Sequence, residues 1–112
     1  MRSMQDRLRN FYGMFSGLPC DVRHYVRQSK YPYVVWTEQG EDGYESLHTD
    51  GHKTEQVITG AVDYFTNREF DATVDAIQNI LDAAEKVAWE LAAVQYEDET
   101  NLIHYTWAWR LS

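Results

Sequence analysis

The spacing of hydrophobic residues changes several times along the chain, and each spacing predicts one type of element. In residues 3–15 the apolar side chains recur every three or four positions, which is helical spacing. This face consists of Met4, Leu8, Phe11, Tyr12 and Phe15. Ser3, with Asp6 three positions later, is typical of a helix start, and a Gly-Leu-Pro sequence follows the segment. We therefore expect an amphipathic N-terminal helix.

Three later segments have the composition of strands. Residues 20–26 alternate valine with charged residues, and residues 31–37 are dense in aromatic and β-branched side chains. Pro32 cannot donate a backbone hydrogen bond, so it belongs at the start of a strand or on an edge. Residues 53–66 are predicted to form a long strand, in which Gly60 indicates a bulge or a close backbone approach.

The last half of the chain predicts a helix followed by a β-hairpin. Thr66 and Glu69 have the spacing of a capping box, and a helical stripe follows over residues 68–86. That stripe comprises Phe70, Val74, Ile77 and Leu81, with Ile80 and Ala84 beside it. Residues 88–96 and 102–111 are predicted to be the two arms of a hairpin with a polar turn. The second arm alternates strictly between large apolar residues and smaller or polar ones.

The resulting element order is α-β-β-β-α-β-β. Strands grouped before and after a helix predict an α+β fold, with an antiparallel or mixed sheet. We expect the N-terminal helix and the long helix to pack on that sheet. A chain of 112 residues is the size of one domain, so residues 1–112 are predicted to fold as a single unit.

Residues 39–52 form the stretch with the least regular pattern. It holds three of the six glycines and several acidic residues, and it is predicted to be a loop. A loop of this length inside a compact domain is usually functional or mobile.

No catalytic or metal-binding motif stands out. His48, Asp50 and His52 resemble metal ligands, but no third imidazole is near, so solvated loop residues are the favoured interpretation. Ser46 lacks the glycine frame of a nucleophile elbow, and the loop glycines do not match a phosphate-binding loop. Cys20 is expected to be a half-buried apolar residue, and Asp63 to face away from its apolar neighbours and be exposed. We expect no cofactor, no metal and no enzymatic activity.

Charge and hydropathy narrow the possible partners. The formal net charge is −8, from 18 acidic and 10 basic residues, which argues against binding the outside of nucleic acid through Lys and Arg. No apolar run approaches the roughly 20 residues that cross a bilayer, so no membrane partner is expected. The first ten residues lack the apolar segment of a secretory signal, which indicates a cytoplasmic protein.

The aromatic residues of the last strand admit two interpretations. They can form core against the helices, or they can contact another protein, since two Trp residues on one strand exceed what a small core requires. Both can hold if the last strand has an open edge.

Four stretches of the chain are similar to a known family. They are Gly17-Leu18-Pro19-Cys20-Asp21-Val22, Tyr31-Pro32-Tyr33-Val34-Val35-Trp36, Thr49-Asp50-Gly51, and residues 57–66 with Asp63-Tyr64-Phe65-Thr66. In this order the sequence resembles, over nearly its whole length, the tail-completion (tail-terminator) proteins of long-tailed bacteriophages. The resemblance rests on strand and turn residues and includes no catalytic signature.

The resemblance implies a structural virion protein that caps the tail tube and joins it to the head connector. Such a protein forms a ring, usually of six subunits, at the head-proximal end of the tail, and DNA passes through the lumen without specific binding. Its partners would be its own copies, the tail tube protein and the head-completion protein. The residues expected at these interfaces are Glu41, Asp42, Tyr44, Glu45, Leu47, His48, Asp50, His52, Trp107 and Trp109.

A second function shares the size and charge. A small acidic phage-type protein can mimic DNA and inhibit a host nucleic-acid-binding protein, which requires carboxylates in rows on one face. In the sequence the acids are divided among the long loop, the helix and the hairpin turn. That division favours the assembly function.

Overall fold

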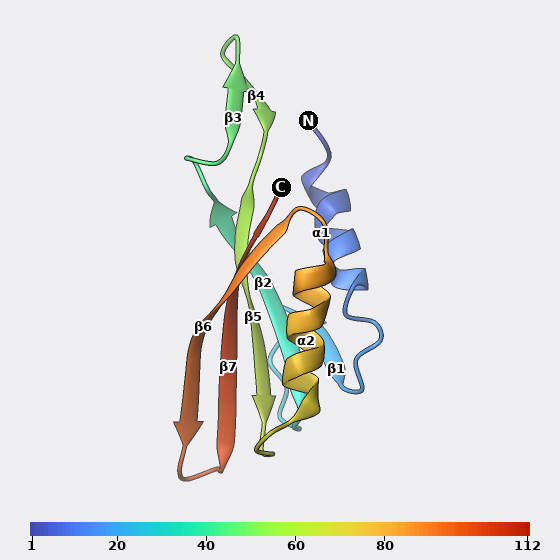
Figure 1. Ribbon diagram of the computed structural model, residues 1–112, viewed down its shortest axis with the longest axis vertical. Helices are drawn as coiled ribbons and strands as arrows, with labels where there is room; N and C mark the ends of the chain where they lie inside the picture. Colours follow the sequence, from blue (N-terminus) through green and yellow to red (C-terminus); the bar gives the residue numbers. More distant parts are fainter.

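The computed structural model describes residues 1–112 and contains two helices and seven strands (Figure 1). In chain order they are α1 (Met4–Gly13), β1 (Asp21–His24), β2 (Tyr33–Glu41), β3 (Leu47–Thr49), β4 (His52–Glu55), β5 (Ile58–Thr66), α2 (Ala72–Ala83), β6 (Val87–Glu97) and β7 (Leu102–Leu111). The predicted α+β class and the C-terminal hairpin are confirmed. The expected long strand over residues 53–66 is instead two strands, β4 and β5, interrupted after Glu55.

Five strands form one mixed sheet in the order β1-β2-β5-β7-β6. β1 runs parallel to β2, and every other neighbouring pair is antiparallel. The two edges are therefore β1 and β6, which lie at opposite margins of the sheet (Figure 1). The last strand, β7, lies between β5 and β6, so it has no open edge to offer a partner.

Both helices cover the same face of the sheet and enclose the main core (Figure 1). The helical stripes predicted from the sequence supply it: Leu8 and Phe11 from α1, Phe15 just after it, and Ile77 and Leu81 from α2, each at most 3% exposed. Trp107 and Trp109 also lie there, with 0% and 1% of their surface exposed. Their assignment to a protein interface is wrong, because the helices bury both rings.

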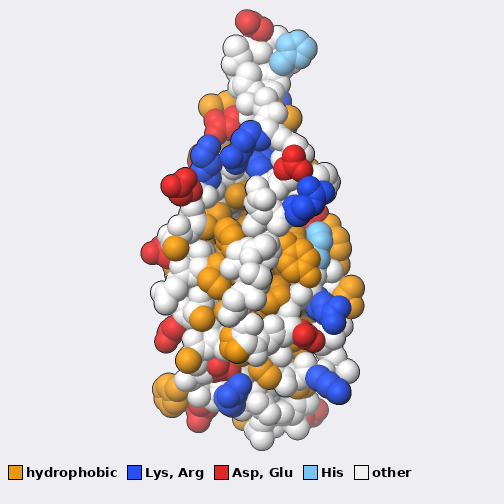
Figure 2. Space-filling view, turned by 90° about the vertical axis from the view of Figure 1, so that its right-hand side faces the viewer, with side chains coloured by type: hydrophobic (Ala, Val, Ile, Leu, Met, Phe, Trp, Pro, Cys, Tyr) orange, Lys and Arg blue, Asp and Glu red, His pale blue; other side chains and the backbone are white.

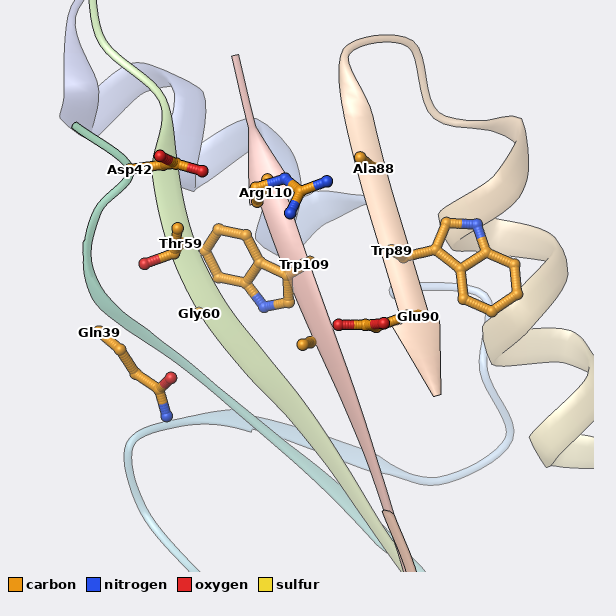
Figure 3. A pocket seen from close by; sticks show the side chains of 10 residues that line it. Gln39, Asp42, Thr59, Gly60, Ala88, Trp89, Glu90, Trp109 and Arg110 are labelled. Atoms are coloured by element: carbon orange, nitrogen blue, oxygen red, sulfur yellow. The ribbon is translucent and has the colours of Figure 1, made fainter. Parts of the chain in front are cut away.

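Gly60 leaves space on β5 for the indole ring of Trp109, because glycine has no side chain. The indole of Trp109 lies beside Gly60 and Thr59, whereas Trp89 points toward α2 (Figure 3). A Cβ on Gly60 would come within 2.2 Å of both the Trp109 ring and the carbonyl oxygen of Thr37. The sequence prediction of a close approach at this glycine is confirmed. A bulge is present as well, but in the facing strand β2 between Glu38 and Gly40.

Helix α2 begins later than its sequence pattern predicts. Asp71 is the N-cap, and its side chain accepts a 3.0 Å hydrogen bond from the amide of Thr73. The hydroxyls of Tyr64 and Thr66 donate to the other carboxylate oxygen, each at 2.7 Å. The predicted capping box between Thr66 and Glu69 is therefore wrong, because Thr66 is engaged with Asp71. Burial raises the pKa of Tyr64 to about 12, and the bond to Asp71 adds to this shift.

Phe70 lies outside the helix to which its spacing assigned it. Its side chain is 99% exposed, and its backbone has a φ of 52°. A bulky residue in the left-handed region is unusual. The apolar stripe of α2 therefore starts at Val74, which is partly buried against the core.

The opposite face of the sheet has a smaller cluster of buried side chains. It consists of Tyr33, Val35, Phe65 and Leu102. Residues 25–32, which connect β1 to β2, contribute to this face: the Tyr31 ring stacks on Tyr33 with 5.8 Å between centroids. The guanidinium of Arg27 lies 5.2 Å from the centroid of Phe65. This connection is therefore held against the sheet while most of its side chains stay exposed.

Replacing Gly60 with alanine tests the close approach. The added methyl group has no space between the Thr37 carbonyl and the Trp109 ring, so we expect Gly60→Ala to lower the unfolding free energy by about 3 kcal/mol. Urea denaturation followed by Trp fluorescence measures it. Gly13→Ala is the control, because nothing lies within 4 Å of the corresponding Cβ. Equal stability of the two variants would contradict the packing described here.

Candidate functional site

Residues 42–57 form an arm that projects beyond the end of the sheet along the long axis of the molecule (Figures 1 and 2). The molecule measures 54 × 25 × 23 Å, and the arm contains the antiparallel pair β3–β4. Asp50 and Gly51, with φ values of 51° and 77°, form its two-residue turn. Two successive positive φ values are typical of the type I′ turn that joins hairpin strands. The predicted loop over residues 39–52 is therefore wrong: it comprises the end of β2, a tight turn and most of a hairpin.

One set of hydrogen bonds closes the root of the arm on itself. The backbone amide of Asp42 donates to the carbonyl of Val57 at 2.9 Å, and the Val57 amide donates to the Ser46 hydroxyl at 3.0 Å. The Asp42 carboxylate accepts the amides of Tyr44 and Glu45 at 3.0 and 3.3 Å. Asp42 thus serves as a turn-forming residue, and Ser46 is buried as a structural hydroxyl.

A second set ties the arm to the body. Arg7 of α1 is buried and donates to the backbone carbonyl of Gln56 at 2.6 Å and to its side-chain oxygen at 3.1 Å. Lys53 of β4 pairs with Glu41 at the end of β2. The hydrogen bonds from Lys53 and Gln56 lower the pKa of Glu41 to about 2. These contacts fix where the arm leaves the sheet.

Beyond its root the arm presents its side chains to solvent. Tyr44 is 101% exposed and Leu47 is 54% exposed, although both are large apolar residues. Glu45, His48, Asp50 and His52 are exposed too. The structure therefore brings seven of the ten expected interface residues into one arm, and Glu41, at the end of β2, lies beside its root.

The histidines of the arm do not form a metal site. In the β3–β4 register His48 is opposite Lys53, and Thr49 is opposite His52. Paired residues share a face and neighbours alternate, so the two imidazoles lie on opposite faces of the ribbon. No group of three or more potential metal ligands occurs in the structure.

Two other residues considered in the sequence, Asp63 and Cys20, are also partly buried in the structure. Asp63 lies on the sheet face away from the helices, as alternation predicts, but its side chain is only 19% exposed. Its carboxylate accepts hydrogen bonds from His104 at 2.7 Å and Thr106 at 2.8 Å, so the expectation of free exposure is wrong. Cys20 is partly buried against the core, as predicted, and burial raises the pKa of its thiol to about 11.

A shallow depression of about 320 Å³ lies over β5, β7 and β6 (Figure 3). Its polar lining is Gln39, Asp42, Thr59, Glu90 and Arg110. Asp42 is already used in the arm root, and no Ser, Cys or His lies among the lining residues to act as nucleophile or base. The arm, with its exposed apolar side chains, is the stronger candidate for a functional surface.

Comparison with known proteins adds no family assignment. No family model matches this sequence, and no curated protein matches it significantly. Neither helix has the length and hydrophobicity that a membrane span requires.

The Glu41–Lys53 contact makes a testable prediction about pH. Because the folded-state pKa of Glu41 is below its usual value, the contact stabilises the folded arm above pH ~4.3 and is lost as the pH falls toward 2. We expect the Glu41 carboxyl resonance in an NMR titration to stay constant down to pH ~3. Lys53→Met should raise that pKa, whereas Lys30→Met should not, because Lys30 lies before the start of β2 and so at the other end of that strand from Glu41. An ordinary Glu41 titration in the unmodified protein would show that the root is not held this way.

Proposed function

We propose that this protein is a structural virion protein of a long-tailed bacteriophage, which caps the tail tube and joins the tail to the head connector. It would act as a ring, usually of six subunits, through which DNA passes. Its partners would be other copies of itself, the tail tube protein and the head-completion protein. The proposal takes the phage role from the sequence resemblance and the mode of action from the arm.

The observation that carries the proposal is the presentation of Tyr44 and Leu47 on a braced arm. Both side chains lie far from the core, so they contribute little to the stability of the isolated fold. Burying exposed aromatic and aliphatic side chains against a partner is favourable, and aromatics are enriched at contact centres. A root held by Arg7, Glu41 and Ser46 limits the entropy lost when such an arm binds.

The net charge of −8 fits a ring that DNA crosses. Acidic walls repel phosphate groups, so DNA can slide past without being retained. DNA can pass through such a ring without a residue that recognises its bases and without a phosphate-binding site.

The DNA-mimic alternative gains one observation from the structure. Residues 69–101, which run from before α2 through β6 to the hairpin turn, contain nine acidic residues and one lysine. Half of the 18 acidic residues are thus carried by α2, β6 and the segments around them. Four large apolar residues are exposed in the same region, namely Phe70, Leu91, Val94 and Tyr96. An apolar surface of this kind is unlike a row of phosphates, so assembly remains the better-supported function.

Complementation of a gene knockout in the phage tests the proposal. We expect the knockout to yield separated heads and tails, or tails of abnormal length, in electron micrographs. Tyr44→Ser/Leu47→Ser should fold normally but reduce the infectious titre by about tenfold or more, because it removes two exposed apolar anchors. Tyr44→Phe/Leu47→Met keeps the apolar surface of the arm and should restore normal titres.

Other outcomes would count against the proposal. Normal infectious particles from the knockout would refute the assembly role. Normal particles together with a host nucleic-acid-binding protein that is no longer inhibited would support the mimic instead. A normal infectious titre from Tyr44→Ser/Leu47→Ser would show that the apolar side chains of the arm are not needed for assembly.

A further inference from the structure

Apart from the arm, the exposed large apolar residues lie mainly in two places. One group is in the connection after β1, and the other is on β6 and just before α2. The first group is Tyr25, Val26 and Tyr31, and the second is Phe70, Leu91, Val94 and Tyr96. β1 and β6 are the two edges of the sheet, so the two surfaces are separated across it. The first surface starts at the β1 edge and continues onto the face opposite the helices, where Tyr31 stacks on Tyr33 of β2.

The surface at the β6 edge is a groove of about 510 Å³ between the start of α2 and the β6–β7 hairpin. Phe70, Val74, Val94, Tyr96, Ile103 and Tyr105 form its apolar lining, with Glu69, Asp71 and Asp75 at its helix side. A bulge between Leu91 and Ala93 shifts the alternation of β6, so that Val94 and Tyr96 share a face with Tyr105 and Ile103. Neither helix covers this end of the sheet face, because α2 starts only at Ala72.

The exposure and the backbone conformation of Phe70 indicate that this groove is a binding site. Its ring is 99% exposed although it borders an apolar surface, and its φ of 52° is disfavoured for a bulky residue. Strained positions of this kind occur preferentially at ligand clamps and other functional sites. A ring held open beside a groove can close over a side chain that enters it.

The surface at the β1 edge has the opposite charge. Residues 21–31, which form it, contain three basic residues and one acidic residue, whereas residues 69–101 contain nine acidic residues and one basic. Arg23, Arg27 and Lys30 are exposed among the apolar residues of the β1 edge. Each edge therefore combines exposed apolar residues with charges that complement those of the other.

The two surfaces also lie at the same level of the sheet. One row of paired residues runs from Trp36 through Val62 and Trp107 to Leu91, and another runs from Tyr33 through Phe65 and His104 to Gln95. Asp21 and His24 of β1 end these rows on the other side. The connection after β1 returns from the first row to the second, and the exposed residues of β6 span the same two rows.

We propose that the acidic groove beside β6 binds the basic connection at residues 23–31 of a second copy of this chain. Two different surfaces then meet, so the contact is head-to-tail, and a pair of copies retains one free surface at each of its ends. Because the surfaces share one level, successive copies need not climb along the strand axis, as closure into a ring requires. The contact is made by side chains from the two edges.

This inference rests on the ring proposed above for its biological use, but it can be tested in solution without phage. Sedimentation velocity of the full chain at low salt should show association that rises with concentration. Raising the salt to 1 M should weaken it about tenfold or more, because screening then acts within about 3 Å. An apolar contact without charge complementarity would not weaken in this way.

Two variants each remove one surface. Arg23→Glu/Lys30→Glu reverses charges of the connection and leaves the groove intact. Phe70→Asn/Tyr96→Thr removes two rings of the groove and leaves the connection intact; Asn tolerates the left-handed backbone at position 70 and Thr suits a strand. Each variant alone should be monomeric. Mixed in equal amounts they should form a heterodimer and no larger species, since only one pair of intact surfaces remains. That heterodimer would also show that both variants fold.

Three results would overturn the inference. They are a wild-type chain that stays monomeric up to about 1 mM at low salt, variants that still associate alone, or a mixture that remains monomeric while the wild type associates. The last result would indicate a symmetric contact through one surface. Failure of the proposed function looks different: the chain would associate as described, yet the phage knockout would produce normal particles.

Discussion

The contact between the Trp109 indole and the bare backbone of Gly60 determines how the rest of the domain packs. Since no Cβ intervenes, the ring can lie against β5 and present its other side to α1, where Phe11 packs 4.5 Å from it, centroid to centroid. Phe11 in turn contacts Phe15 and Trp36 at 5.2 and 5.4 Å. The N-terminal helix therefore docks on aromatic rings from β2 and β7. This docking also positions Arg7, on the same helix, to hold the root of the arm through Gln56.

The fold class and the buried faces could be predicted from the sequence, because periodicity reports directly which side chains share a face. The stripe of α2 and the alternation in β7 identify core positions correctly. Periodicity does not report which strands are neighbours. The last strand in the sequence therefore looked like an edge with open hydrogen-bonding groups, whereas it lies between β5 and β6. For the same reason, the sequence shows that basic residues concentrate in residues 1–37 and acidic residues in residues 69–101, but not that β1 and β6 are the two edges of the sheet.

The arm and the start of α2 show two other reasons for error. Glycines and acids suggested an irregular loop, although Asp50-Gly51 is itself a common hairpin turn and could have indicated β3–β4. Phe70 continues the apolar spacing of α2 by sequence alone. The helix nevertheless starts after it, because Asp71 receives the hydroxyls of Tyr64 and Thr66 and is thereby fixed as the N-cap. A hydrogen-bonding network between distant elements thus overrides local spacing.

The bulge in β6 has a consequence for solubility. An eleven-residue edge strand with exposed valine, leucine and tyrosine would ordinarily be a template for open-ended sheet growth. The extra residue between Leu91 and Ala93 breaks the regular spacing of the backbone groups, and Glu90 and Glu97 place charges on the same strand. The irregular edge thus disfavours pairing of β6 with a strand of another molecule. Val94 and Tyr96, whose direction the bulge changes, remain exposed for binding. Such an edge would help to keep free copies of the chain out of aggregates when the protein is concentrated.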